Sequence, residues 1–447
     1  MKLIYNVKDK PKFGQVIVFA LQQVLAILAA TIAVPAIIGN GMSQSAALFG
    51  AGVGTIVYLL FTKFKSPVFL GSSFAFIGSM FAAFAGAASA AAGYAGLIIG
   101  AAMAGLVYVV ISLVVKFAGV KWIDKLMPAV VIGPTVSIIG LSLAGNAVAD
   151  LQVGKVATAN TYLCIVCGLV TLFTVVLCSV YGKKMGKLIP FIIGICAGYA
   201  VASIFTVIGI VAGNDALKII DFSVFRGMQI FAVPDFTFIT AFKGFKDLTG
   251  SYIATLAAAY IPVAFVVFAE HIADHKNLSS VIESDLLKEP GLHRTLLGDG
   301  VGSMAGAFFG GCPNTTYGES VGCVAITGNA SVITILTTAI ICLVISFFNP
   351  FVVLLASIPN CVMGGVCITL YGFIAVSGLK MVQKVDLGDN ANLFTVATIL
   401  ICGIGGLALN FGKVTITEVA TALILGIIVN LVVSKGKKEN KENKEDK

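Results

Sequence analysis

Two glutamates, Glu270 and Glu319, lie within stretches of sequence that are otherwise apolar enough to cross a membrane. A charged side chain at the centre of a bilayer costs about 2.5 to 3.5 kcal/mol or more, so acids in such segments usually handle ions, protons or polar ligands. These two side chains therefore predict a transport site.

The sequence AEHIADH, which starts at Ala269, adds a third acid and two imidazoles to the first glutamate. Glu270 and Asp274 are four residues apart and share a face if the helix continues. A poorly hydrated carboxyl can take a proton from one side of the membrane and release it to the other, with a neighbouring histidine as relay. We expect Glu270 and His275 to couple protons to transport. We expect His271 to be a packing residue and Asp274 to face cytoplasmic water.

The two histidines also allow a different chemistry, since an imidazole pair one helical turn apart is typical of a zinc-dependent hydrolase. A zinc site needs a third protein ligand. The one further histidine, His293, lies in a charged loop beside Arg294. An intramembrane metal-dependent hydrolase is thus a remote alternative, and we expect no metal, no cofactor and no enzymatic activity.

The composition indicates that most of the chain lies in a lipid bilayer. Hydrophobic residues make up 58% of the 447 residues and charged residues only 11%, which is typical of a protein with many bilayer-spanning helices. The formal net charge of +8 comes from lysines and arginines in short loops and at both ends, as in cytoplasmic segments. We therefore expect an all-α, multi-pass protein with both termini in the cytoplasm, and no nucleic-acid partner.

Fourteen apolar segments are long enough to be candidate spans. Their approximate cores are 14–38, 44–62, 67–80, 92–115, 127–145, 160–181, 188–212, 251–271, 295–310, 313–327, 331–348, 350–378, 391–410 and 415–434. A polar stretch, 212–250, separates seven segments from seven, so the second half must run opposite to the first. The third segment of each half is short and interrupted by Pro67 or Pro313, which predicts extended chain and a binding site at these two places.

The sequence GESVGCVAITG, from Gly318, resembles the signature of the nucleobase/ascorbate transporter family. Further blocks resemble the uracil permease branch of that family, and they lie in the expected order over nearly the whole chain: LGSSFAF from Leu70, AEHIADH from Ala269, EPGLHR from Glu289 and IPNCVMGG from Ile358. Two positions depart from the pattern. Ser320 stands where the family usually has Asn, and Gln23 stands where many relatives have His.

The resemblance implies a fold of fourteen segments in two inverted repeats of seven, with a short strand in segments 3 and 10. It also implies a homodimer that forms through a gate domain, and an elevator movement of a core domain. The charge run at the C-terminus predicts a disordered cytoplasmic tail. The expected parts are the core domain, 13–118 and 251–349, the gate domain, 119–250 and 350–434, and the tail, 435–447.

For function, the resemblance implies a proton-coupled symporter that imports uracil across the cytoplasmic membrane. A purine symporter of the same family, for xanthine, urate or guanine, is the nearest alternative. An anion transporter is disfavoured because two facing carboxylates repel a negative ligand. The residues that the resemblance assigns to the base are Glu270, Glu319, Gly318, Phe74, Ser73, Ala30, Tyr317 and Tyr371.

Overall fold

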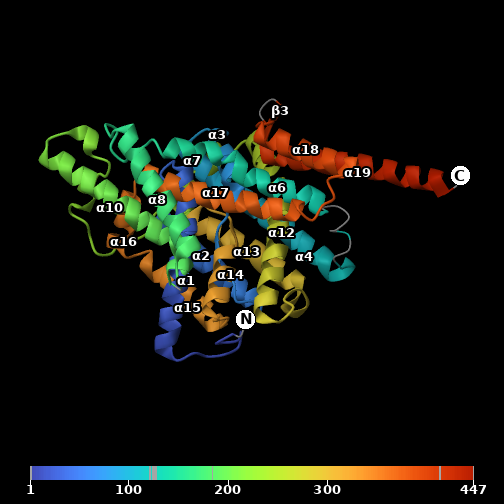
Figure 1. The fold of residues 1–447 in the computed structure, drawn as a ribbon, viewed down its shortest axis with the longest axis horizontal. Coiled ribbons are helices and arrows are strands. Elements are labelled where there is room, and N and C mark those ends of the chain that lie inside the picture. The colour runs from blue at the N-terminus through green and yellow to red at the C-terminus, as the bar shows by residue number, and fades with distance from the viewer. Residues whose placement is uncertain (1–2, 120–121, 123–127, 184, 412–413, 446–447) are drawn as a thin grey trace.

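The fold is described here by a computed structural model, for residues 3–119, 122, 128–183, 185–411 and 414–445 (Figure 1). It is predominantly helical. The helices and strands of the first half are α1 (Phe13–Ile38), α2 (Gln44–Phe61), β1 (Leu70–Ser72), η1 (Phe74–Phe76), α3 (Ile77–Ala85), α4 (Ala90–Ala118), α6 (Ala129–Ser142), α7 (Ala144–Asp150), α8 (Thr161–Tyr181), α9 (Met185–Leu188), α10 (Pro190–Val211), η2 (Asp215–Leu217), η3 (Phe222–Phe225), α11 (Thr237–Gly244) and η4 (Phe245–Asp247). Those of the second half are α12 (Gly250–Ile282), η5 (Leu287–Gly291), α13 (Leu292–Gly310), β2 (Asn314–Thr316), α14 (Gly318–Thr327), α15 (Val332–Ile345), α16 (Asn349–Ser357), α17 (Asn360–Val382), α18 (Asn390–Ile404), β3 (Leu409–Phe411), β4 (Val414–Ile416) and α19 (Glu418–Glu445).

Eight helices of the described chain are long and apolar enough to cross a membrane: α1, α2, α4, the continuous pair α6 and α7, α8, α10, α12 and α17. Four further apolar helices are shorter, and they span Phe74–Ala85, Val332–Ile345, Asn390–Ile404 and Glu418–Val433. The chain is thus a helical protein with many membrane segments. The count of fourteen and the inverted repeat stay predictions.

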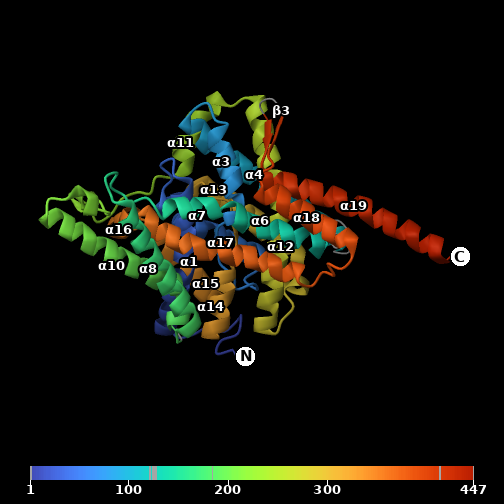
Figure 2. The same cartoon turned by 45° about the horizontal axis from the view of Figure 1, so that its top comes forward.

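The helices pack in two groups, which can be followed in Figures 1 and 2. In one group α13 packs on α2 and α4, while α12 packs on α4 and α15 packs on α1 and α2. In the other group α17 packs on α6, α7 and α8, while α18 packs on α6 and α19. Longer helices from distant parts of the chain therefore surround the short segments, which include β1 and β2.

Two of those short segments meet as a pair of antiparallel strands, with Leu70 of β1 opposite Thr316 of β2. Extended chain inside a membrane protein must satisfy its backbone groups within the protein, and the two strands do so for each other. The pairing continues beyond the strands, because the Ser73 N–H donates to the Pro313 carbonyl at 2.9 Å. A glycine is required at position 71, where a Cβ atom would lie 2.4 Å from the ring of Tyr317.

Helix α2 and helix α13 approach closely behind this pair. A Cβ atom at Gly54 would lie 2.7 Å from the carbonyl oxygen of Gly302, so a larger residue there would push the helices apart. The side chain of Asn314 lies in the same contact and donates to the Gly50 carbonyl at 3.1 Å. This hydrogen bond fixes β2 to α2.

The N-terminal segment runs beside the end of α14. Tyr5 forms a parallel bridge with Asn329, and the Ile4 N–H donates to the Gly328 carbonyl at 2.7 Å. Nearby, Lys65 forms an ion pair with Glu289, and this cation holds the pKa of the exposed Glu289 carboxyl below its usual value. These contacts join loops that are far apart in the sequence.

The last helix of the described chain is long, and the disordered tail, 435–447, stays a prediction. Helix α19 continues to Glu445 and projects away from the other helices in Figure 1. Lysine and glutamate are good helix formers, so the charged run extends the apolar helix that precedes it. Before α19, β3 and β4 form an antiparallel hairpin, with Leu409 opposite Ile416.

Candidate functional site

A cavity of about 370 Å³ lies between the two groups of helices and is lined by residues of both. The first group contributes α12, β2, α14 and η1, and the second contributes α6, α10 and α17. The lining residues are Phe74, Ala75, Val136, Ile139, Phe191, Glu270, Ala273, Asp274, Asn277, Thr315, Thr316, Tyr317, Gly318, Glu319, Leu370, Phe373, Ile374, Ser377 and Met381.

Three carboxylates line this cavity, and no lysine or arginine is among its described lining residues. Glu270 and Asp274 lie one turn apart on α12, as their spacing predicts, whereas Glu319 lies in the first turn of α14. The Thr316 hydroxyl donates to the Asp274 carboxylate at 2.8 Å. Like charges in a site of low dielectric repel strongly, so these three acids disfavour a negatively charged ligand.

The turn that precedes Glu319 presents backbone to the cavity. Gly318 is exposed there, and nothing lies closer than 3.8 Å to the position that its Cβ atom would occupy. Gly318 and Glu319 begin α14, and the first N–H groups of a helix have no acceptor within that helix. These groups can therefore donate to a ligand carbonyl, and the helix dipole favours negative charge at the same end.

Apolar and aromatic residues form the other walls. Phe74 and Ala75 line the cavity from η1, and Phe373 lines it from α17. Tyr317 also lines it, and its hydroxyl donates to the Ser72 carbonyl at 2.8 Å. The cavity thus combines an acidic wall with a surface that suits a planar apolar face.

Five of the sequence-predicted site residues line the cavity, and four do not. Ala30 is buried in α1 and Ser73 is buried between β1 and η1. Tyr371 is buried in α17, where its ring meets the Phe74 ring edge-on with the centroids 6.0 Å apart. His275 lies on a different face of α12. The five lining residues are Glu270, Glu319, Gly318, Phe74 and Tyr317.

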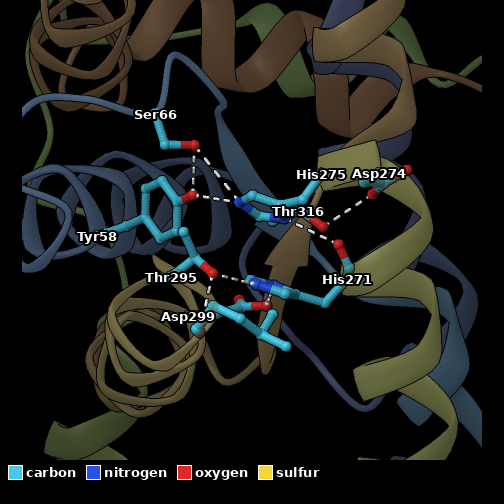
Figure 3. A network of polar contacts seen from close by, with 9 residues as sticks. Tyr58, Ser66, His271, Asp274, His275, Thr295, Asp299 and Thr316 are labelled. Carbon is cyan, nitrogen blue, oxygen red and sulfur yellow. Dashed lines mark hydrogen bonds and ion pairs between the residues drawn. The ribbon is translucent and has the colours of Figure 1, made fainter. Parts of the chain in front are cut away.

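The second face of α12 carries both histidines, which are completely or almost completely buried (Figure 3). His271 Nδ1 lies 2.7 Å from an oxygen of Asp299 in α13, and its Nε2 lies 3.0 Å from the Thr295 hydroxyl. His275 Nε2 lies 2.7 Å from the Tyr58 hydroxyl, and its Nδ1 donates to the His271 carbonyl at 2.8 Å. The two imidazole rings stack with centroids 4.0 Å apart.

These contacts bear on the zinc hypothesis. All four ring nitrogens of the two histidines already have protein partners. In the described part of the chain no group of three His, Cys, Asp or Glu residues could hold a metal ion. The histidine pair is therefore part of a hydrogen-bond network of protein groups.

Sequence reasoning missed two residues at this centre. It placed Asp274 in cytoplasmic water, whereas Asp274 lines the cavity beside Glu270. It also left out Asp299, which is completely buried against His271. The signal for Asp299 was present, since it is an acid within a predicted apolar segment, 295–310.

Comparison with known sequences gives matches over the whole length of the chain. The profile of the permease family matches residues 14–411. Among curated proteins, the uracil permease of Bacillus caldolyticus is 39% identical over 99% of this chain and 97% of its own length. That of Bacillus subtilis is 37% identical over 99% and 98%, and that of Escherichia coli K12 is 34% identical over 96% and 93%.

Solved structures of two transporters share the fold at low sequence identity. The transmembrane domain of the cyanobacterial bicarbonate transporter BicA aligns over 96% of this chain and all of its own, with a TM-score of 0.64 and 18% identity. The murine anion transporter Slc26a9, in its inward-facing state, aligns over 96% of this chain and 69% of its own, with a TM-score of 0.65 and 12% identity. With its apolar helices, the chain is thus a multi-pass membrane protein.

Proposed function

The chain belongs to the permease family, as its motifs predict, and from that premise we propose that it is a symporter that imports uracil together with protons across the cytoplasmic membrane. The observation that carries the proposal is the cavity in which three carboxylates and an exposed helix turn face an aromatic wall. The names of the matched relatives support uracil as the substrate.

The chemistry of uracil suits these groups. The base is planar and carries two ring N–H donors and two carbonyl acceptors. Glu270 and Glu319 accept from the N–H groups, while the backbone N–H groups at Gly318 and Glu319 donate to a carbonyl. Phe74 lies against the ring, with Tyr317 beside it. Ser73 precedes the lining residue Phe74, and the Tyr371 ring contacts the Phe74 ring. With Ala30, which is buried in α1, we assign these residues to the shell behind the site.

Proton coupling follows from the acids. A neutral base brings no charge to offset three carboxylates, so its binding favours a site in which at least one acid is protonated. We assign this proton to Glu270, with Asp274 as a second acid on the same helix face. His275 supports the coupling from the buried face through Tyr58.

The movement that we propose uses the two groups of helices. The core domain, 13–118 and 251–349, carries the base, and the gate domain, 119–250 and 350–434, stays in place and forms the contact of a homodimer. The position of the cavity between residues of both domains supports this division. In this scheme fourteen segments form two inverted repeats and both termini lie in the cytoplasm.

An uptake assay with radiolabelled uracil tests the proposed function directly. Membrane vesicles that contain the protein should accumulate uracil when a pH gradient is imposed, and a protonophore should abolish the accumulation. Unlabelled uracil should compete fully, whereas xanthine, hypoxanthine and urate should compete weakly. If a purine competed more strongly than uracil, the purine alternative would be correct. If accumulation did not depend on the pH gradient, the proposed proton coupling would be wrong.

Equilibrium binding in detergent tests the assigned site. Glu319→Ala should weaken uracil binding about 10- to 100-fold, since a hydrogen bond to a charged group contributes about 1.5 to 3 kcal/mol. Glu283→Ala, at the exposed end of α12, is the control and should bind as the wild type does. If Glu319→Ala bound uracil with unchanged affinity, the base would bind at another site.

A further inference from the structure

The hydroxyl of Ser320 joins three parts of the chain behind the cavity. Ser320 follows Glu319 in α14 and is completely buried. The side-chain amide of Gln23, in α1, donates to the Ser320 hydroxyl oxygen. The backbone N–H of Phe69, just before β1, donates to the same oxygen at 3.0 Å. One side chain thus connects α1 and the start of β1 to α14.

Phe69 is held through both of its backbone groups. Its N–H donates to Ser320, and its carbonyl accepts a hydrogen bond from the Tyr317 N–H at 3.1 Å. Tyr317 and Ser320 flank Gly318 and Glu319, which line the cavity. The turn that presents the Glu319 carboxylate and the first N–H groups of α14 is therefore fixed at both ends, from the side that faces away from the cavity.

Gln23 and Ser320 are also the two positions at which the sequence departs from the family pattern. They are 297 residues apart in the sequence, yet they contact each other, and their side chains are only 2% and 0% exposed. A buried polar group that loses its partner costs about 1 to 3 kcal/mol. The two departures are therefore a single coupled change in the structure.

We propose that Gln23 and Ser320 form a coupled positioning pair that sets the orientation of Glu319 and, through it, the affinity and selectivity for the base. Neither residue lines the cavity, so the pair acts through the turn at Gly318 and Glu319. The choice of uracil as the probe rests on the proposed function, whereas the coupling itself rests on the hydrogen bonds to Ser320.

A double-mutant cycle measures the coupling. Gln23→Ala and Ser320→Ala should each raise the Kd for uracil about tenfold. The Kd of the double variant should lie within about twofold of that of the single variant that binds uracil more weakly. The ratio of uracil to xanthine affinity should fall in the same variants, which a loss of folded protein would not cause. Thr327→Val is the matched control, since it removes a hydroxyl at the opposite end of α14, where it donates to the Cys323 carbonyl and accepts from the Asn329 N–H. Its Kd should stay within twofold of the wild type.

The outcomes separate this inference from the proposed function. Additive effects in the cycle, or an unchanged Kd in both single variants, overturn the coupling. If the wild type binds a purine in place of uracil, the proposed substrate is wrong and the same cycle is read with that purine. If Ser320→Ala does not fold, the nearly isosteric Ser320→Cys, with its weaker acceptor, takes its place.

Hydrogen exchange in the ligand-free protein tests the positioning role without any assumption about the substrate. Hydrogen exchange at the Phe69 amide should be faster in Ser320→Ala, which removes its acceptor, and also in Gln23→Ala, which frees the serine hydroxyl to move. Exchange at the wild-type rate in both variants would overturn the positioning role, whatever base the protein carries.

Discussion

The two faces of α12 use the same kinds of residue for different purposes. Glu270 and Asp274 line the cavity, whereas His271 and His275 are buried in contacts with Asp299 and Tyr58. On the first face the acids have few protein partners and remain available to a ligand or a proton. On the second face the polar groups mainly satisfy one another.

The contrast shows what a titratable residue needs in order to act in transport. Burial alone does not make a functional group, since Asp299 is more deeply buried than Glu270. What matters is whether the side chain is available to a ligand or a proton. This depends on whether the neighbouring helix offers it a hydrogen-bond partner, as α13 does for His271 with Thr295 and Asp299. Mutations of the first face should therefore change transport, and mutations of the second should chiefly change stability.

Glu270→Gln should have the largest effect on transport. The amide keeps the shape of the side chain but cannot take up a proton, so we expect accumulation of radiolabelled uracil under a pH gradient to fall at least 100-fold. Glu283→Gln makes the same chemical change at the exposed end of α12 and should transport normally. Accumulation at the wild-type level by Glu270→Gln would contradict the assignment of the proton to this residue.

Asp274→Asn should reduce pH-driven accumulation less, by about tenfold. The variant retains an oxygen for the Thr316 hydroxyl, so the change isolates the ionisable proton. Thr316→Val is the complementary control, because it removes the hydroxyl and keeps the acid, and its uptake should vary with pH as in the wild type. If uptake by Asp274→Asn kept its wild-type magnitude and pH dependence, Asp274 would take no part in coupling.

His271→Leu should affect stability more than binding. Removing one partner of a buried hydrogen bond costs about 1 to 3 kcal/mol, because the other partner is left unsatisfied. We expect a markedly lower Tm in detergent and a Kd for uracil within threefold of the wild type. The double variant His271→Leu with Asp299→Leu should recover part of the lost Tm. If the Kd of His271→Leu rose tenfold or more, both faces of α12 would serve the ligand.

His275→Gln should produce the smallest change. Glutamine can still donate and accept hydrogen bonds, so the contact with Tyr58 is partly preserved. We expect a two- to threefold fall in pH-driven uptake with an unchanged Kd, as suits a supporting role. Uptake and its pH profile should be measured together, since a loss as large as that of Glu270→Gln would place both faces on one proton path.

The sequence was sufficient for the family, the helical membrane class and the position of the acids. It was insufficient for residues whose partners come from distant segments. His275 follows Glu270 by five residues, which turns it well away from the Glu270 face of a helix with 3.6 residues per turn. Asp299 could be recognised as an intramembrane acid, but its partner His271 could be found only once α12 and α13 were packed together. The fourteen segments, the domain division and the dimer stay predictions.

The pairing of β1 with β2 has a consequence for biogenesis. The Tyr317 hydroxyl bonds to the Ser72 carbonyl across 245 residues of sequence, so the two strands leave the ribosome far apart in time. At about 5 to 20 residues per second, the first strand waits roughly 12 to 50 s for its partner. During that interval Leu70 can already bond to the Thr55 hydroxyl of α2, but β1 lacks the partners that β2 and Tyr317 later supply. The insertion machinery must shield these backbone groups until the second half of the protein has been made.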